Sequence, residues 1–201
     1  MGFFPDDAVV PIEWRTEDLW LRVLRPDVTE LDFAALMESR ERLRRWSNSS
    51  WPADDFTLDA NRQDLIEHER EWEAREAFAY TVLNPDGTRC EGCVYINPLE
   101  LWLDHCGFKR DGDGSRFDDD TPAVTFWVCD SALARGLDRQ LLTGLRNWFQ
   151  QEWPFTQVVF PLLNTLTADI ALLESSGLVL HATHSLRSDA PLSCFVYGES
   201  A

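Results

Sequence analysis

The feature that most constrains this chain is an apolar, strand-like run that leads within a few residues into a long amphipathic helix. Residues 123–129 read AVTFWVC, and β-branched and aromatic residues of this kind favour a buried strand. Residues 135–153 carry large apolar side chains at helical spacing, which predicts a helix with one broad buried face. That face consists of Leu137, Leu141, Leu142, Leu145, Trp148, Phe149 and Trp153. Because a strand and a helix must then share one core, all-α and all-β folds are excluded.

Further strand and helix patterns alternate along the rest of the chain. Strand patterns occupy residues 19–26, two runs within 78–98, 157–161, and two closing runs that read VLHATHSL and SCFVYG. Helical patterns occupy residues 29–45, 58–77 and 167–176. The turn Asn84-Pro85-Asp86-Gly87 favours an antiparallel hairpin. This order predicts an α/β fold, with a mixed, mostly antiparallel sheet of about six to seven strands and helices on both faces.

Length and charge limit the domain count and the classes of partner. We expect the 201 residues to form a single domain over 1–201, with an N-terminal extension at 1–18 and an acidic surface loop at 104–121. The chain has 18 Lys and Arg against 35 Asp and Glu, a net charge of −17, which repels nucleic-acid phosphates and anionic membranes. No run approaches the roughly 20 apolar residues of a membrane helix. Neither nucleic acid nor a membrane is therefore an expected partner.

The cysteines indicate free thiols and no metal site. Five cysteines are an odd number and too sparse for a disulfide scaffold, which suits the reducing cytoplasm. Cys90 and Cys93 have the spacing of half a zinc site, but residues three apart on a regular strand point to opposite faces. The same argument separates His181 from His184. We therefore expect no bound metal.

The loop between the strand at 123–129 and the following helix has the features of an anion site. A helix N-terminus offers unpaired backbone N–H groups and a partial positive charge. Gly136 allows an anion to approach the backbone closely, and Arg135 and Arg139 add positive charge on the same turn. Many α/β proteins share this arrangement without a phosphate ligand, so it is a weak signal alone.

The chain resembles the GNAT superfamily of acetyl-CoA-dependent N-acetyltransferases in element order and in three motifs. The family motif Q/R-x-x-G-x-G/A, whose amides hold the cofactor pyrophosphate, falls without a gap on Leu133-Ala134-Arg135-Gly136-Leu137-Asp138. Phe126-Trp127-Val128 resembles a strand of the branch that acetylates the N-termini of ribosomal proteins, and the run from Asn164 to Gly177 resembles the second family motif. The resemblance implies the GNAT fold with acetyl-CoA as cosubstrate. It implies cofactor binding by Val128, Cys129, Leu133, Ala134, Arg135, Gly136, Leu137, Asp138, Arg139 and Asn164.

Several positions depart from the family pattern. Leu133 stands where the family has Gln or Arg, and Asp138 where it has Gly or Ala. Asp138 either repels the pyrophosphate or caps the first helical turn itself and fills the anion site. Leu173 occupies the position of the tyrosine that many members use as general acid. A catalytic base is not assigned, and Asp120 is the weak candidate nearest to the strand carboxylate of other members.

The resemblance and the charge together lead to two functional hypotheses. The first is an N-acetyltransferase acting on a primary amine of a cationic small molecule or a basic peptide, which the negative surface would attract. Trp46 and Trp51 flank a polar turn that borders the acceptor site in this family, where aromatic rings can bind an ammonium group. The second is a catalytically inactive GNAT-fold module that recognises a basic partner or a small cation. The oligomeric state, a homodimer included, is left open.

Overall fold

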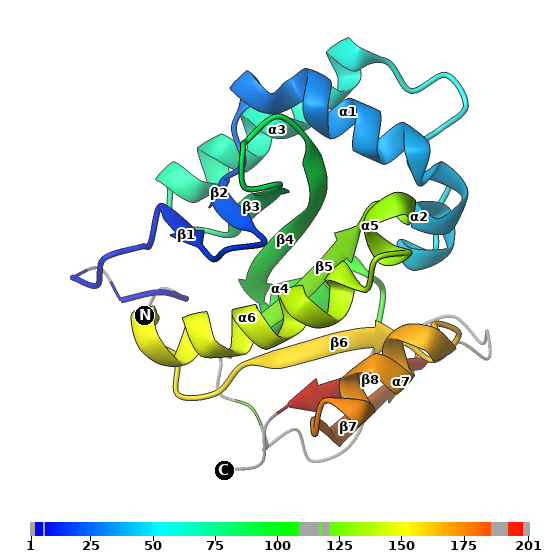
Figure 1. Cartoon of the computed structure of the whole chain (residues 1–201). Helices are drawn as coiled ribbons and strands as arrows, with labels where there is room; N and C mark the ends of the chain where they lie inside the picture. The colour runs from blue at the N-terminus through cyan, green and yellow to red at the C-terminus, as the bar shows by residue number, and fades with distance from the viewer. Residues whose placement is uncertain (1–2, 6, 109–116, 118–120, 186–192, 199–201) are drawn as a thin grey trace. The chain divides into compact units, whose positions relative to one another are not determined.

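A computed structural model describes residues 3–5, 7–108, 117, 121–185 and 193–198 of the chain (Figure 1). The chain divides into two compact units, each assembled from separate stretches of sequence. We call Val9–Tyr95 together with Phe126–Trp153 the first unit. We call Met1–Ala8, Ile96–Thr125 and Pro154–Ala201 the second unit. No described helix has both the length and the apolar composition needed to cross a bilayer.

The first unit contains the N-terminal strands and most of the helices. Its strands are β1 (Glu13–Arg15), β2 (Trp20–Val23), β3 (Phe78–Leu83) and the start of β4 (Cys90–Pro98). Its helices are η1 (Pro26–Val28), α1 (Thr29–Glu38), α2 (Arg40–Trp46), α3 (Leu58–Glu73), α5 (Asp130–Leu133) and α6 (Leu137–Glu152). The unit also holds the end of β5 (Pro122–Val128).

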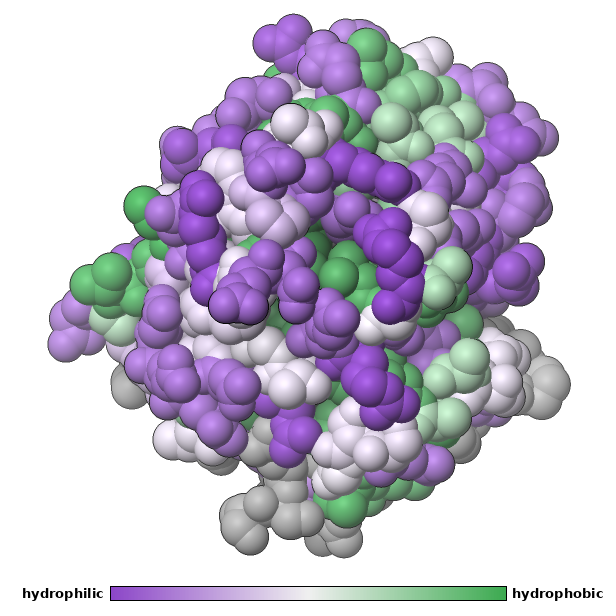
Figure 2. All heavy atoms as spheres, in the orientation of Figure 1, coloured by the Kyte–Doolittle hydropathy of each residue, from purple (hydrophilic) through white to green (hydrophobic). Residues whose placement is uncertain are grey.

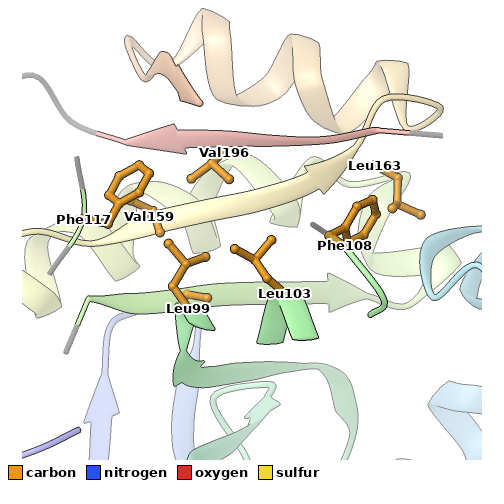
Figure 3. Packing of buried hydrophobic residues seen from close by; sticks show 8 residues of the cluster. Leu99, Leu103, Phe108, Phe117, Val159, Leu163 and Val196 are labelled. Atoms are coloured by element: carbon orange, nitrogen blue, oxygen red, sulfur yellow. The ribbon is translucent and has the colours of Figure 1, made fainter. Parts of the chain in front are cut away.

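The second unit contains the start of β5 and the C-terminal elements. These are α4 (Leu99–His105), β6 (Val159–Leu163), α7 (Thr167–Ser175), β7 (Val179–Ser185) and β8 (Ser193–Gly198). Its core is one cluster of buried side chains in which Leu99 and Leu103 of α4 pack with residues of β6 and β8 (Figure 3). The expected end of the helix at Gly177 is confirmed, because this residue has a left-handed φ of 85° directly after α7.

The strand order is β1-β2-β3-β4-β5-β6-β8-β7. The pairs β1/β2, β2/β3, β6/β8 and β8/β7 are antiparallel, whereas β5 pairs with β6 in parallel, with Ala123 opposite Val159. The predicted α/β class and the mixed, mostly antiparallel sheet are therefore confirmed. Within the described residues the sheet has eight strands, one more than the upper end of the expected range. β1, which the sequence patterns did not indicate, lies within the segment expected to be an extension.

Helices cover both faces of the sheet in the first unit, as predicted. Tyr80 of β3 meets Trp148 of α6, with 5.0 Å between ring centroids. Its neighbour Thr81 points to the other face, where its hydroxyl lies 3.5 Å from Cys90 Sγ, and this sulfur lies near Asp32 of α1. Successive strand residues alternate between faces, so α6 and α1 lie on opposite sides of β3 and β4.

The apolar face predicted for α6 is buried as expected. Its leucines and aromatic residues lie in the core, and Trp148 has no exposed surface. Trp148 also meets Trp153 edge to face, with 5.4 Å between ring centroids. Gly144 lets the helix approach β1, because a Cβ built there would lie 2.5 Å from the Trp14 ring.

Two helices differ from the sequence prediction. The helix expected over residues 29–45 is broken at Ser39, whose φ of −112° and ψ of 12° lie outside the helical range. The break separates α1 from α2, and it lets the Ser39 hydroxyl accept a hydrogen bond from the Asp130 N–H at 2.9 Å. α4 overlaps the start of the expected acidic loop. Asp120 and most of that loop lie outside the described residues.

Gly92 provides a test of how closely β4 and β5 pack. A Cβ built on Gly92 would lie 2.0 Å from the backbone oxygen of Trp127, so Gly92→Ala must displace one of the two strands. We expect the free energy of unfolding to fall by about 3 kcal/mol. Gly177→Ala is the control, since its φ is left-handed but its Cβ meets nothing within 4 Å. Gly177→Ala should lower the free energy of unfolding by about 1 kcal/mol. If urea titrations show the same loss in the free energy of unfolding for both variants, the close packing of β4 against β5 at Gly92 is contradicted.

Candidate functional site

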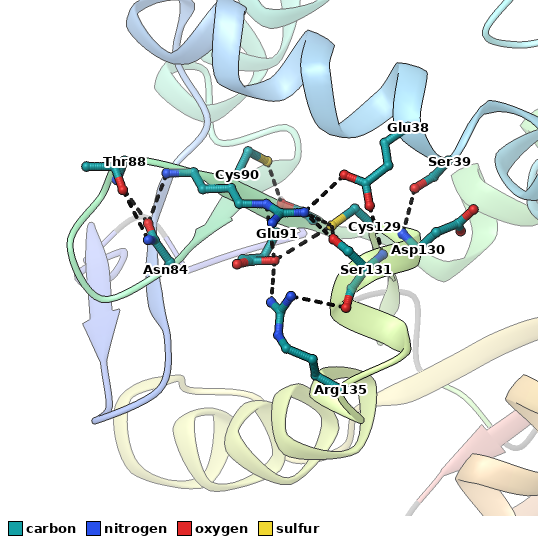
Figure 4. Close-up of polar contacts among 12 residues, drawn as sticks. Glu38, Ser39, Asn84, Thr88, Cys90, Glu91, Cys129, Asp130, Ser131 and Arg135 are labelled. Carbon is teal, nitrogen blue, oxygen red and sulfur yellow. Dashed lines mark hydrogen bonds and ion pairs between the residues drawn. The ribbon is translucent and has the colours of Figure 1, made fainter.

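The loop after β5 and the start of α6 form the candidate site, which lies within the first unit (Figure 4). Gly136 is the N-cap of α6 and has a left-handed φ of 75°, which a residue with a Cβ adopts only at a cost. A Cβ built on Gly136 meets nothing within 4 Å. Space is therefore open at this end of the helix, and the loop requires glycine for its backbone conformation.

The first turn of α6 has free amide groups. The first N–H groups of any α-helix lack an intrahelical partner, and no side chain caps α6. Asp138 lies in this turn, but its carboxylate makes no hydrogen bond or ion pair with any residue that the structure describes. Of the two alternatives for Asp138, self-capping is therefore wrong. The N–H groups of Leu137 and Asp138 remain available to an anion, and the Asp138 carboxylate remains as a nearby negative charge.

The amide groups at the start of the loop are occupied by side chains of the same chain. Glu38 at the end of α1 accepts a hydrogen bond from the Ser131 N–H at 2.8 Å. Its neighbour Ser39 accepts one from the Asp130 N–H at 2.9 Å. The capacity of this loop to bind an anion is therefore confined to the region of Gly136 and the first turn of α6.

A buried carboxylate organises the arginines around the loop. The Glu91 side chain is 6% exposed, and its Oε2 lies 2.8 Å from Nη2 of Arg135 and 3.8 Å from Nε of Arg89. Arg135 also donates to the Ser131 backbone oxygen at 3.1 Å. Arg89 extends further, donating to the Ser131 hydroxyl and to Glu38 Oε2, the latter at 3.0 Å. The positive charge of Arg135, which the sequence analysis expected to attract an anion, is thus largely balanced by Glu91.

Glu38 is held ionised by this arrangement. Hydrogen bonds from Ser131 and the charge of Arg89 lower the pKa of the Glu38 carboxyl below its ordinary value of 4.5. The interaction therefore stabilises the folded loop above that pH and is lost as the carboxyl becomes protonated in more acidic solution.

The N–H groups at the end of β5 point to opposite edges of the strand. The Cys129 N–H donates to the Glu91 backbone oxygen at 2.7 Å, so this amide faces β4. Successive amides of an extended strand point to opposite edges, so the Val128 N–H points away from β4. Arg42 of α2 donates to the Val128 oxygen and pairs with Asp130 at 2.7 Å, which places a guanidinium beside that edge.

The sequence did not indicate the residues that hold this loop in place. Glu38, Ser39 and Arg42 come from the end of α1 and from α2, whereas Arg89 and Glu91 come from the hairpin of β3 and β4. Arg42 and Asp130 are 88 positions apart in the chain. No local motif links such residues, and only the folded sheet brings them together.

The other predicted site residues are distributed as follows. Leu137 is buried beside the loop, while Leu133, Ala134 and Arg139 are exposed. Asn164 lies directly after β6 in the second unit and is half-buried. Leu173 of α7 is buried, so this position offers no proton donor. Asp120 falls outside the described residues.

Trp46 and Trp51 are both half-buried in the first unit, but they belong to different aromatic groups. Trp46 lies beside Tyr95 of β4, with 6.3 Å between ring centroids. Trp51 meets Phe56 edge to face at 6.2 Å, and Phe56 stacks on Phe33 of α1. The two indoles therefore do not form a single cage.

Trp51 also contacts a carboxyl group. Its side chain is hydrogen-bonded to Asp64 of α3. Partial desolvation raises the pKa of the Asp64 carboxyl, and the Trp51 hydrogen bond and the nearby His68 oppose that rise. An acidic group thus lies beside a half-buried aromatic side chain near the turn between α2 and α3.

The placement predicted for Cys90 and Cys93 is wrong. The Cys93 Sγ lies 3.2 Å from Oδ1 of Asp32, and the Cys90 Sγ lies 3.9 Å from the same oxygen. Both thiols therefore lie on the face of β4 that meets α1, so the regular alternation of side chains is broken between them. Burial raises the pKa of Asp32 and also that of Cys93.

Comparison with known proteins identifies the fold. No protein-family model matches the sequence, and no curated protein sequence matches it. Among solved structures, the microcin C7 self-immunity acetyltransferase MccE, determined with acetyl-CoA and AMP, matches with a TM-score of 0.71 at 12% identity over 98% of this chain and 100% of that one. The chain has the GNAT acetyltransferase fold.

Two further GNAT-fold structures support this result. The ribosomal-protein-S5-alanine acetyltransferase from Vibrio fischeri matches with a TM-score of 0.68 at 13% identity, over 94% of this chain and 96% of that one. A protein assigned to the GNAT-family acetyltransferases from Bordetella pertussis matches with a TM-score of 0.63 at 18% identity, over 94% and 99% of the two chains. The GNAT fold expected from the sequence motifs is therefore confirmed.

The hydrogen bond between Glu38 and Ser131 provides a test of the loop. Glu38→Gln removes the charge that Arg89 and the Ser131 amide bind, and at pH 7 we expect the free energy of unfolding to fall by about 1 kcal/mol. The loss should shrink as the pH falls below 4.5, where Glu38 is protonated in the unfolded chain, and it should vanish once the pH is below the lowered pKa of Glu38 in the folded loop. Glu41→Gln is the matched control, since Glu41 is exposed on α2, and it should cost less than about 0.5 kcal/mol at either pH. If the loss in the free energy of unfolding of Glu38→Gln does not change with pH, the negative charge of Glu38 does not stabilise the loop.

Proposed function

We propose that the protein is an N-acetyltransferase that transfers an acetyl group from acetyl-CoA to a primary amine of a cationic small molecule or a basic peptide. The observation that carries this proposal is the open first turn of α6 at Gly136, next to a β5 amide that points away from β4, in a chain with the GNAT fold. The proposed enzyme would work in the cytoplasm, where acetyl-CoA is available.

The residues at the start of α6 fit the diphosphate of acetyl-CoA. Gly136 leaves room for a phosphate against the backbone, and the uncapped amide groups of the first turn can donate hydrogen bonds to it. Arg139, exposed on the same turn, adds a positive charge. The MccE structure contains acetyl-CoA, which supports this choice of cosubstrate. When bound, acetyl-CoA supplies a thioester whose acyl carbon accepts the amine.

Val128 is the residue we assign to the carbonyl of that thioester. Its N–H points away from β4, and a hydrogen bond from it would stabilise the negative charge that develops on the carbonyl oxygen. In the complete reaction a C–N bond forms and the C–S bond breaks, so that the CoA thiolate leaves. The attacking ammonium first loses a proton to a base, for which Asp120 remains our candidate, and the nitrogen releases a second proton to solvent as the amide forms. Leu173 offers no proton to the leaving thiolate.

Aromatic surface and negative charge support a cationic acceptor. Trp51 and Phe56 lie beside the Asp64 carboxyl, and this combination of rings and carboxylate attracts an ammonium group. The net charge of −17 favours the approach of a cation over that of an anion. Figure 2 shows hydrophilic side chains over most of the face in view, with smaller hydrophobic areas between them.

Calorimetry with acetyl-CoA tests the cosubstrate site. Gly136→Trp fills the open space at the helix end, and we expect the Kd to rise at least about tenfold. Gly136→Ala is its control, because it carries the same left-handed strain without the bulk. Asp138→Gly removes a repulsion of roughly 1 kcal/mol and should tighten binding about fivefold.

The matched control for Asp138→Gly is Asp59→Gly. Asp59 occupies the same position in the first turn of α3, which like α6 is 16 residues long, so the two substitutions change the same helical position and the same charge. Asp59→Gly should leave the Kd unchanged. If the wild-type protein and Asp138→Gly both fail to bind acetyl-CoA at millimolar concentration, the enzyme proposal is wrong and the chain is a binding module.

Acetylation kinetics with amines of different charge test the acceptor site. Asp64→Asn removes the negative charge beside Trp51 while its amide oxygen can still accept the indole hydrogen bond. We expect KM for a dicationic amine or a lysine-rich peptide to rise about fivefold with little change in kcat. Asp59→Asn, an exposed acid on the same helix, should leave KM unchanged. If Asp64→Asn raises KM more for an amine with no second positive charge than for a dicationic amine, the assignment of Asp64 to the acceptor site is contradicted.

A further inference from the structure

Three potential metal ligands meet inside the first unit, remote in sequence from the α6 site. Asp32 Oδ1, Cys90 Sγ and Cys93 Sγ all lie within 4.8 Å of one another, and all three residues are buried. The carboxyl oxygen lies 3.2 Å from one sulfur and 3.9 Å from the other. Ligand atoms of a tetrahedral zinc ion are separated by about 3.4 to 3.8 Å, as follows from Zn–S bonds of about 2.3 Å and Zn–O bonds of about 2.0 to 2.2 Å. The two sulfur-to-oxygen distances are therefore within about 0.4 Å of the separation that a zinc ion needs, and the two sulfurs lie no more than 4.8 Å apart.

We propose that Asp32, Cys90 and Cys93 form a structural zinc site that joins α1 to β4. Thiolate sulfur and carboxylate oxygen are both donors that zinc accepts, whereas magnesium and calcium require oxygen ligands. The three residues supply three of the four positions of a tetrahedral ion and leave the fourth for a further donor. The site does not depend on the proposed acetyl transfer, and no residue of the loop after β5 belongs to it.

The surroundings of the three ligands resemble an outer coordination shell. Asn61 of α3 donates from Nδ2 to Asp32 Oδ2 at 2.9 Å, which leaves Oδ1 directed at the two sulfurs. The same Nδ2 lies 3.3 Å from the Thr29 backbone oxygen, so the orientation of the amide is fixed. Such outer partners orient ligating carboxylates in metal sites. The Thr81 hydroxyl, 3.5 Å from Cys90 Sγ, and the Gly92 backbone oxygen, 3.4 Å from the same sulfur, are neutral oxygens near the group.

The Asp32 carboxyl lacks the partners that a buried acid without a metal usually has. Its oxygens meet one amide and two thiols, and it forms no ion pair with any residue in the described part of the chain. Thiols are weak hydrogen-bond donors, so they compensate poorly for the loss of water. A zinc ion would supply the missing positive charge. On binding, each thiol releases its proton to solvent, and the resulting charge of two thiolates and one carboxylate is reduced from −3 to −1.

Metal analysis of the purified full-length chain tests the proposal. We expect about one zinc per chain in wild-type protein by mass spectrometry, or about one after zinc is added to chelator-treated protein. Replacement by cobalt should give the sulfur-to-metal charge-transfer bands of a tetrahedral thiolate site. Cys93→Ser and Cys90→Ser should lose the metal, whereas Cys106→Ser, which removes the half-buried thiol that follows α4, should retain it.

A measurement on the wild-type protein covers the case in which the cysteine variants fail to fold. X-ray absorption at the zinc edge should show two sulfur neighbours, with oxygen or nitrogen in the remaining positions. A wild-type protein that neither contains zinc nor binds zinc or cobalt would overturn the proposal. Zinc retained by folded Cys93→Ser, or a zinc spectrum without two sulfurs, would do the same.

Discussion

The loop that precedes α6 depends on a buried carboxylate. Glu91 lies in the interior, where an unpaired negative charge is strongly unfavourable, so Arg135 must approach it from the loop and Arg89 from the hairpin. Arg89 in turn reaches Glu38 and Ser131, which connects the end of α1 to the same loop. One desolvated charge thus fixes the position of three separate segments around the start of α6.

The same network explains why the anion site is restricted. Because Glu38 and Ser39 occupy the amide groups at the start of the loop, only the end near Gly136 remains open. Asp138 adds an unbalanced negative charge at that end, which would weaken the binding of a diphosphate without blocking it. The architecture is the GNAT fold, while Leu133 and Asp138 in its loop differ from the GNAT sequence motif.

Several elements could be predicted from local patterns, and others could not. The predictions of an apolar face on α6 and of a helix end at Gly177 are confirmed. Both depend on local sequence: the spacing of apolar residues along one helix, and a glycine that can adopt a left-handed φ. The break at Ser39 is not predicted by local pattern, and it accompanies a hydrogen bond from Asp130, which is distant in the chain. The placement of the Cys90 and Cys93 thiols on the same face of β4 is not predicted by sequence, because side chains alternate between faces only in a regular strand and strands can be irregular.

The sequence by itself determined the fold class, the glycine at the start of α6 and the motif that surrounds it, since all of these follow from residue type and short-range spacing. Only the tertiary structure decided which side chains meet that motif. Glu38 and Ser131 are 93 positions apart, and Arg89 and Ser131 are 42 apart. Contacts over such separations form only after the sheet has assembled, because no local preference brings these residues together.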